Sequence, residues 1–261
     1  MSTRVGVTGG EIEVHTSGDG PLIVLVPSLG RGGADFADLA AGLAAAGWKV
    51  ARPEPRGVAG TAPMAGSTME TFAADLAAVI EALAPPPRPT AVVVGHALGN
   101  RIVRLTATRH PGLVRGVALL AAGGLVAPEP EALADLRACF DPTRNRRDHL
   151  EVVRRAFFAP GNDPSAWEGG WYPTVALHQG RANSATDPAE WWEAGSAPVL
   201  VIQPAADVIA PAANAVRLAD SIGDRATVVT IPDAGHALLP EQPSATLAAL
   251  LEWLGTLTAE R

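Results

Sequence analysis

The chain has 261 residues, of which 48% are hydrophobic, and a formal net charge of −7 at pH 7. This length is enough for one sizeable α/β domain with a well-buried core, or for two small domains. The basic residues form no dense run that could follow a phosphate backbone, so nucleic acid is not expected as a partner. No apolar run approaches the roughly 18 residues of a membrane-spanning helix, so no membrane partner is expected either.

The N-terminal segment and the cysteine content bear on location. The first 15 residues lack the charged region and the apolar region of a secretory signal. The single cysteine, Cys139, cannot form an internal disulfide, which suits a reducing compartment. We therefore expect a cytoplasmic protein.

Strand and helix patterns alternate along most of the chain. Strands are expected at residues 11–17, 22–27, 48–53, 91–95, 116–122, 198–204 and 226–232. Helices are expected at 35–47, after an S-x-x-E capping box at Ser67 and Glu70, at 100–110, at 214–222 and near 244–257. The alternation predicts an α/β fold with a mostly parallel, doubly wound sheet.

Residues 125–197 interrupt this alternation, because they hold no convincing buried strand and are rich in charge, proline and aromatic residues. An insertion of this length between two core strands is a poor loop, but it fits a helical cap. We expect this cap over the carboxyl ends of the strands, where open α/β sheets bind ligands. Residues 1–124 and 198–261 would then form the core.

Aromatic residues are concentrated in the predicted cap. We expect Trp167, Trp171, Trp191 and Phe157 to contact a substrate. The alternative is that these rings only form the cap's own small core.

The segment VVVGHALGNRIVR, residues 92–104, places an apolar strand before a G-x-x-x-G pattern and a helix. Gly95 and Gly99 stand two residues before and two residues after Ala97, where small residues let a strand turn sharply into a helix. The first N–H groups of that helix would favour negative charge developing at the turn. The alternative is an ordinary strand-to-helix turn. A dinucleotide-binding turn is disfavoured, since the spacing is not G-x-G-x-x-G.

Two further residues stand just past predicted strands. Asp207 follows the strand at 198–204, where a carboxylate can orient a histidine. His236 lies in a loop after the strand at 226–232, preceded by a glycine. Each alone could be a capping or solvated loop residue. Together, in the order turn, acid, histidine, they follow the chain order of an α/β-hydrolase triad.

With these segments, the chain resembles the α/β-hydrolase fold superfamily of esterases, lipases and epoxide hydrolases from end to end. VPSLGRGGADF (26–36) is similar to the family's oxyanion loop, and RPEPRGVAGTAP (52–63) resembles its D-x-R-G-x-G-x-S segment in degraded form. GHALLPEQP (235–243) matches the family's histidine loop.

The resemblance implies a role for five residues. Ala97 would occupy the nucleophile position, Asp207 would be the acid and His236 the base. The backbone N–H groups of Leu29 and Leu98 would form the oxyanion hole. The family's histidine–glycine pair in the oxyanion loop is replaced here by Pro27 and Ser28.

Alanine at the nucleophile position closes the acyl-enzyme route, because no hydroxyl oxygen is present there. Either a serine was replaced by engineering, or the natural protein lacks the nucleophile. In the natural case, His236 could act as a general base in a lyase reaction, a cyclisation or a hydrolysis without a covalent intermediate. Ser28 could also serve as nucleophile, or the pocket could only bind a small molecule.

We therefore expect an α/β-hydrolase family protein that acts on a small hydrophobic ester, lactone or related carbonyl compound, with Ser28 among the substrate-contacting residues. The alternatives are the histidine-based lyase or cyclase and the non-catalytic binding protein. No cofactor is expected, and the scattered histidines predict no metal site. A homodimer stays open.

Overall fold

The computed structural model describes residues 1–87 and 89–259. Its strands form one sheet in the order β1-β2-β4-β3-β5-β6-β7-β8. Their bounds are β1 (Ser2–Val7), β2 (Gly10–Ser17), β3 (Leu22–Val26), β4 (Lys49–Pro53), β5 (Ala91–His96), β6 (Val114–Leu120), β7 (Val199–Pro204) and β8 (Ala226–Ile231). Strands β3 to β8 run parallel to their neighbours, whereas β2 is antiparallel to both β1 and β4. The predicted α/β fold with a mostly parallel sheet is confirmed.

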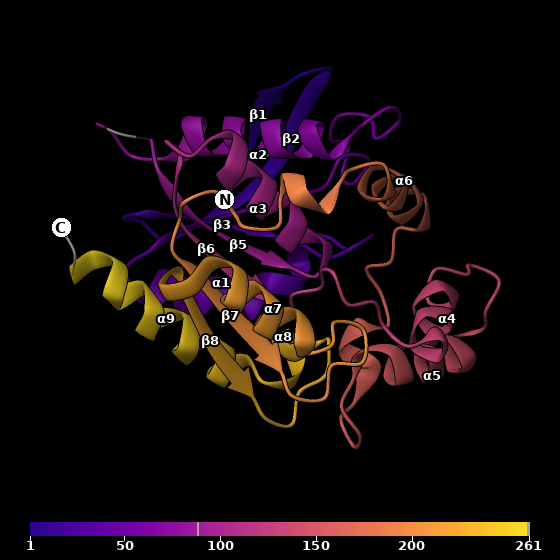
Figure 1. Ribbon diagram of the computed structural model, residues 1–261. Coiled ribbons are helices and arrows are strands. Elements are labelled where there is room, and N and C mark those ends of the chain that lie inside the picture. The colour runs from indigo at the N-terminus through magenta and orange to yellow at the C-terminus, as the bar shows by residue number, and fades with distance from the viewer. Residues whose placement is uncertain (88, 260–261) are drawn as a thin grey trace.

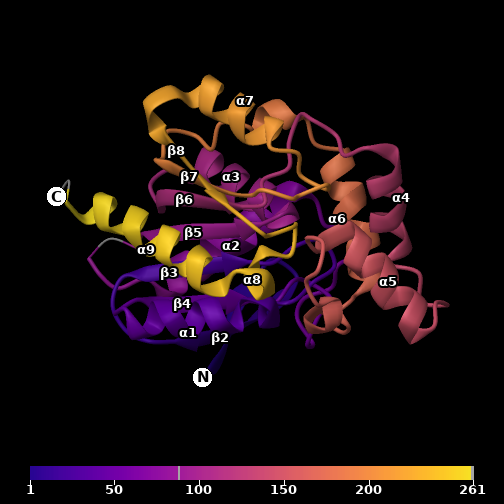
Figure 2. The same cartoon turned by 90° about the horizontal axis from the view of Figure 1, so that it is seen from below.

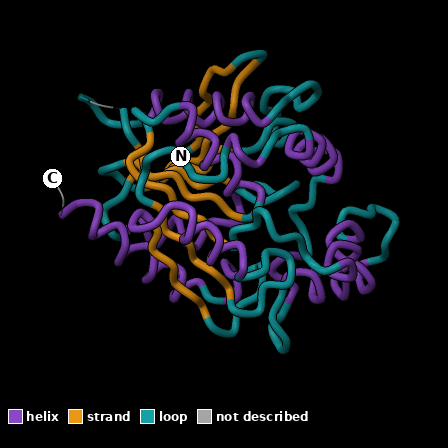
Figure 3. The backbone as a smooth tube through the Cα atoms, viewed as in Figure 1, coloured by secondary structure: helices purple, strands orange, loops and turns teal. Residues whose placement is uncertain are grey.

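Helices cover both faces of this sheet (Figure 3). One face packs on α1 (Ala37–Ala45) and α9 (Pro243–Ala259), and the other on α2 (Met69–Leu83), α3 (Leu98–Arg109) and α7 (Ala213–Ile222). Alternate residues of each central strand serve the two faces, so that all of β3 and β5 is buried. This explains why these strands carry continuous apolar runs.

Three helices lie between β6 and β7: α4 (Pro130–Ala138), α5 (Arg146–Phe157) and α6 (Pro173–Ser184). Together with the short helices η2 (Pro164–Trp167) and η3 (Pro188–Glu190), they make up what we call the helical insertion. Figures 1 and 2 both show α4 and α5 at the end of the molecule opposite the C-terminal end of α9. Residues of α5 and η2 form a separate apolar cluster that also includes Ala237, so the insertion packs on the loop after β8.

Three local features differ from the sequence expectations. Strand β1 was not expected from the sequence. It pairs with β2 through a two-residue turn in which Gly9 adopts a φ of 82°. Helix α2 is capped by Thr68 and Thr71 instead of Ser67 and Glu70, because Thr68 is the last residue with extended backbone and its hydroxyl accepts the N–H of Thr71. The predicted helix at 35–47 is split into η1 (Gly33–Phe36) and α1.

The remaining short helices are η4 (Gly223–Arg225) and α8 (Leu238–Glu241), both outside the insertion. Among the helices of the described residues, none is both long enough and apolar enough to cross a membrane.

Candidate active site

A sharp turn joins β5 to α3, and Ala97 lies at its apex. Its backbone has φ 50° and ψ −108°, a conformation that residues with a side chain rarely adopt. A Cβ atom on Gly95 would lie 2.4 Å from the carbonyl carbon of Gly99, and one on Gly99 would lie 2.3 Å from the carbonyl oxygen of Val26. Both glycines are therefore required by close backbone contacts, as the sequence pattern predicts.

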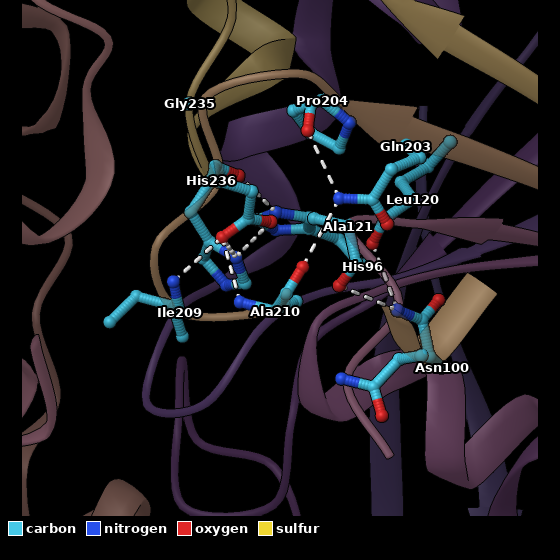
Figure 4. A network of polar contacts seen from close by, with 12 residues as sticks. His96, Asn100, Leu120, Ala121, Gln203, Pro204, Ile209, Ala210, Gly235 and His236 are labelled. Atoms are coloured by element: carbon cyan, nitrogen blue, oxygen red, sulfur yellow. Dashed lines mark hydrogen bonds and ion pairs between the residues drawn. The ribbon is translucent and has the colours of Figure 1, made fainter. Parts of the chain in front are cut away.

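Asn100 holds this turn against the neighbouring strand. Its side-chain amide donates hydrogen bonds to the carbonyl oxygens of Leu120 and Ala121, at 2.9 and 3.2 Å (Figure 4). The N–H of Ala97 donates to the carbonyl of Leu120 at 3.1 Å. These contacts anchor the strained turn to the carboxyl end of β6, which offsets the cost of the unusual backbone conformation.

His236 and Asp207 form a buried pair. The Nδ1 atom of His236 lies 2.9 Å from one Asp207 carboxylate oxygen and 3.1 Å from the other. The Asp207 carboxylate also accepts the N–H groups of Ile209 at 2.9 Å and Ala210 at 2.8 Å, which fixes its orientation (Figure 4). A carboxylate that accepts Nδ1–H leaves the lone pair of His236 on Nε2, which is the form a general base needs.

The loop that carries His236 is packed tightly against the end of α5. A Cβ atom on Gly235 would lie 2.5 Å from the carbonyl oxygen of Phe157, and the N–H of Gly235 donates to Glu241 at 2.8 Å. Glu241 also accepts the N–H of Ala159 at 2.7 Å. The histidine loop is thus bound to the helical insertion on one side and to α8 on the other.

A cavity of about 410 Å³ joins these groups. Residues that follow β3, β5, β6, β7 and β8 line it from the sheet side, and residues of the helical insertion line it from the other. The lining residues are Ser28, Leu29, Arg31, Ala97, Leu98, Arg101, Gly123, Pro128, Leu133, Leu136, Arg137, Phe140, Phe157, Trp167, Trp171, Gly180, Asn183, Ser184, Ile209, Ala210 and His236. The cavity thus lies at the carboxyl edge of the sheet, where ligands bind in open α/β folds.

The cavity brings together most of the site residues that the sequence predicts. Ala97 and His236 both border it, and Asp207 lies directly behind His236. Leu29 and Leu98 border it too, and Leu98 is the first residue of α3, so its N–H has no partner within the helix. The predicted substrate-contacting residues Ser28, Phe157, Trp167 and Trp171 are also in the lining.

Trp191 is the exception and requires a correction. Its side chain is 2% exposed and belongs to the large apolar cluster beneath α2 and α3, whereas the cavity lining within the described residues does not include it. Its ring packs on Trp192 and under the guanidinium groups of Arg101 and Arg104. Because η3 turns the chain back toward the core, this indole contacts arginines of α3 instead of a substrate.

Arg31 connects the loop after β3 to the helical insertion. Its guanidinium pairs with both oxygens of Asp35, at 2.8 and 2.6 Å, and donates to the carbonyl of Gly169 at 2.8 Å. It lies 4.5 Å from the ring centroids of both Trp167 and Trp171. The charge of Arg31 is therefore compensated by a carboxylate and by two aromatic rings.

Arg101 is a site residue that the sequence analysis missed. It lies four residues after Ala97 on α3, it borders the cavity, and its Nη1 donates to the Asn183 side chain at 2.6 Å. Burial lowers the pKa of Arg101 below its ordinary value. The signal was present in the sequence, because residues four apart on a helix share one face.

The other histidines near the site and the single cysteine are not placed to take part in the chemistry. His96 is fully buried, and burial followed by the proximity of His236 lowers its pKa to about 3, so it is neutral. His178 lies on α6 outside the cavity lining of the described residues. Burial raises the pKa of the Cys139 thiol to about 12, which leaves little thiolate at neutral pH. Within the described residues, no cluster of three or more His, Cys, Asp or Glu side chains could hold a metal ion.

Comparison with known proteins identifies the family to which this site geometry belongs. A model of the alpha/beta hydrolase fold matches residues 21–243. The BpoC protein of Mycobacterium tuberculosis, which carries the name of a non-heme bromoperoxidase, is 29% identical over 265 residues, which cover 93% of this chain and 97% of BpoC. The 2-(acetamidomethylene)succinate hydrolase of Mesorhizobium japonicum is 25% identical over 272 residues, covering 97% of this chain and 95% of that enzyme.

Solved structures agree with this result. The crystal structure of BpoC from Mycobacterium tuberculosis superposes with a TM-score of 0.78 at 26% identity, and the match covers 94% of this chain and 96% of BpoC. The enol-lactonase of Burkholderia xenovorans gives a TM-score of 0.79 at 22% identity, with 97% of this chain and all of that chain (100%) covered, which shows a shared fold. From the family match and these structures, we conclude that the chain belongs to the α/β-hydrolase fold family.

Proposed function

We propose that this protein acts on an ester, a lactone or a related carbonyl compound, with His236 as a general base and without a covalent intermediate on residue 97. The observation that carries the proposal is the pair of His236 and Asp207 at a cavity of about 410 Å³ that Ala97 also lines. A relative of 25% identity is a hydrolase by name, which supports this reaction class.

The base would act on water. Nε2 of His236 takes a proton from a water molecule as its oxygen attacks the carbonyl carbon, and the imidazolium then returns the proton to the leaving oxygen as the carbon–oxygen bond breaks. Asp207 stabilises the imidazolium through its contact of 2.9 Å with Nδ1. The atoms balance with one water consumed for each ester or lactone bond cleaved.

The negative charge of the tetrahedral intermediate would be stabilised at the turn. Leu29 and Leu98 border the cavity, so their N–H groups are the candidate donors, and the N-terminus of α3 adds the positive end of its dipole. Donors of this kind lower the barrier by about 3–4 kcal/mol each. The site can therefore favour carbonyl addition even with alanine at the turn.

The experiment measures hydrolysis of a panel of p-nitrophenyl esters and γ- and δ-lactones by the unaltered protein, by His236→Ala and by Asp207→Asn. We expect kcat to fall by about 100-fold or more for His236→Ala, as for loss of a general base. His178→Ala removes a histidine on α6 outside the cavity and serves as the matched control, with unchanged turnover.

Pre-steady-state kinetics separate this mechanism from a covalent one. A burst of p-nitrophenol equal to the enzyme concentration would indicate an acyl-enzyme on another nucleophile such as Ser28, and would contradict the proposal. Turnover that survives the loss of His236 would contradict it as well. If compounds bind and are recovered unchanged, the protein is a binding protein on a hydrolase scaffold.

A further inference from the structure

The lining of the cavity is rich in positive charge. It includes three arginines, Arg31, Arg101 and Arg137, and among the described lining residues there is no aspartate or glutamate. Asp207, the nearest acid to His236, is already engaged by that imidazole and by two backbone N–H groups. Arg31 is compensated by Asp35. Of the three lining arginines, Arg101 and Arg137 therefore have no carboxylate partner among the described residues, and Arg101 Nη1 contacts Asn183, which also lines the cavity.

Arg101 is the deeper of these two. Its side chain is only partly accessible. Its Nη1 donates to the neutral side-chain amide of Asn183 at 2.6 Å, and not to a carboxylate. A guanidinium has five N–H donors, so this single contact leaves most of its donors for a ligand. Its plane also packs 5.2 Å from the ring centroid of Trp191, which supports it from the side of the core.

The neighbouring Arg104 shows what a purely structural arginine looks like on the same helix. All three of its nitrogen atoms donate to main-chain carbonyls, those of Asn100, Gly123 and Trp192, and its side chain is fully buried. Burial and the charge of Arg101 lower the pKa of Arg104 to about 9. The charge of Arg101 thus disfavours the charged form of Arg104, and a carboxylate bound to Arg101 would offset this repulsion.

We propose that the substrate carries a carboxylate and that Arg101, with Asn183 beside it, receives this carboxylate in the cavity. A guanidinium binds a carboxylate through two parallel N–H···O bonds, which a neutral group cannot match. This inference rests on the proposed function for the chemistry at His236, and adds the class of substrate.

The remaining wall of the cavity fits an apolar body. Phe140, Phe157, Trp171, Leu133 and Leu136 line it, and about 410 Å³ suits a molecule of modest size. Arg137 is exposed on α4 and borders the cavity, where its charge would draw anions toward the opening. The expected substrate is therefore an amphipathic monocarboxylate with an ester, lactone or related carbonyl group.

Binding of matched pairs of ligands tests this inference without any turnover. Isothermal titration calorimetry would compare 4-phenylbutyrate and 3-phenylpropionate with their primary amides, which have the same shape and no charge. We expect the carboxylates to bind at least about 10-fold more tightly than the amides, as for a hydrogen bond to a charged group. Arg101→Gln should abolish this preference and leave the affinity for the amides within about 2-fold. Equal affinity for acid and amide, or no binding of the acids, would overturn the inference.

Asn183→Asp provides a second test that does not remove a buried side chain. The new carboxylate would lie against Arg101 and compensate its charge, so the fold is kept while the preference for acids is lost by about 10-fold or more. Arg217→Gln removes an exposed arginine on α7, outside the cavity, and is the matched control with unchanged affinities. A preference for acids that persists in both Arg101→Gln and Asn183→Asp would contradict the assignment.

The variant His236→Ala keeps the two proposals apart. It should lose turnover and keep the preference for carboxylates, because Arg101 is independent of the base. If His236→Ala turns over normally while Arg101→Gln loses the preference, the general-base mechanism fails and the carboxylate site stands. If the preference is absent from the unaltered protein while turnover depends on His236, the carboxylate site fails and the general-base mechanism stands.

Discussion

His96 donates its Nε2–H to the main-chain carbonyl oxygen of His236, with 2.8 Å between the two atoms. The carbonyl can only accept, so the proton of the neutral ring is on Nε2. The two rings also lie in contact, with centroids 5.1 Å apart. His96 therefore fixes the backbone of the residue that we assign as the base. It must remain neutral, because a positive charge on His96 would disfavour the imidazolium that His236 forms when it takes a proton.

The first prediction concerns the pH dependence of stability. Burial lowers the pKa of His96 to about 3, from 6.5 in the unfolded chain. Below pH 6.5 the unfolded chain binds a proton that the folded chain does not, so the free energy of unfolding decreases as the pH falls toward 3. Between pH 7.5 and pH 5, this group should cost about 2 kcal/mol.

Urea unfolding of the wild type and of His96→Gln at both pH values checks this prediction. Glutamine keeps a side-chain N–H for the carbonyl of His236 but does not titrate. From pH 7.5 to pH 5, the free energy of unfolding of His96→Gln should therefore fall by about 2 kcal/mol less than that of the wild type. Equal losses in both proteins would show that His96 is protonated in the folded state or takes no part in the acid response.

The second prediction is that Ala97→Ser creates a serine hydrolase. The backbone at residue 97 already has the φ of 50° that places a side chain at the apex of the turn, beside the cavity that His236 borders. A serine hydroxyl there would be deprotonated by His236 and attack the carbonyl directly. We expect labelling by a fluorophosphonate, and ester hydrolysis faster by about 100-fold or more.

Mass spectrometry of the labelled protein locates the modification on residue 97, and the double variant Ala97→Ser with His236→Ala is the control without a base. A folded Ala97→Ser protein that neither reacts with the probe nor gains esterase activity would show that this turn is not arranged for a nucleophile.

The third prediction tests the steric requirement at the turn. A Cβ atom at position 95 would meet the Gly99 main chain at 2.4 and 2.5 Å, and main-chain atoms cannot move aside as a flexible side chain can. Gly95→Ala should lower the free energy of unfolding by about 3 kcal/mol or more. Gly112→Ala adds the same methyl group where nothing lies within 4 Å, and it should be nearly neutral. Similar melting temperatures for both variants would contradict the close contact.

The fourth prediction concerns a buried ion pair near the loop after β4. Arg56 binds both carboxylate oxygens of Asp75, at 2.6 and 2.7 Å, and donates to the carbonyl of Thr8 at 2.8 Å. The hydrogen bond to Asp75 raises the pKa of Arg56. Asp75→Ala leaves an uncompensated buried guanidinium and should cost about 3–5 kcal/mol.

Denaturant unfolding of Asp75→Ala and of the double variant Arg56→Met with Asp75→Leu provides the comparison. The double variant removes both charges and replaces them with apolar groups of similar size, so it should lose less stability than the single variant. A double variant that is less stable than Asp75→Ala would contradict the expected cost of the unpaired guanidinium.

The sequence was sufficient for the turn and for the pair of His236 and Asp207, for a clear physical reason. All the carboxyl ends of parallel strands meet at one edge, so residues that follow β5, β7 and β8 converge even though they are far apart in the chain. The glycines around Ala97 are likewise readable, since close backbone contacts admit no side chain.

The surroundings of Trp191 and the partner of Arg101 could not be predicted from the sequence, although the spacing from Ala97 already places Arg101 on the same face of α3. Both depend on how the helical insertion returns to the core: η3 directs the Trp191 ring against Arg104, and α6 brings Asn183 to Arg101. Composition shows that aromatic residues gather in the insertion, but the side on which each ring lies is set by packing between elements that are distant in sequence. Strand β1 was missed because its alternation of buried and exposed residues is short, whereas its partner β2 was predicted at 11–17.

Arg31 has a mechanical consequence for the site. Arg31 is two residues after Leu29. It is held on one side by Asp35, and on the other by the indoles of Trp167 and Trp171 and the carbonyl of Gly169. These contacts tie the insertion to the segment that follows β3, so a displacement of the insertion would have to break them or move that segment as well. Loss of the Arg31 side chain would therefore loosen the helical insertion and the segment that carries Leu29 together.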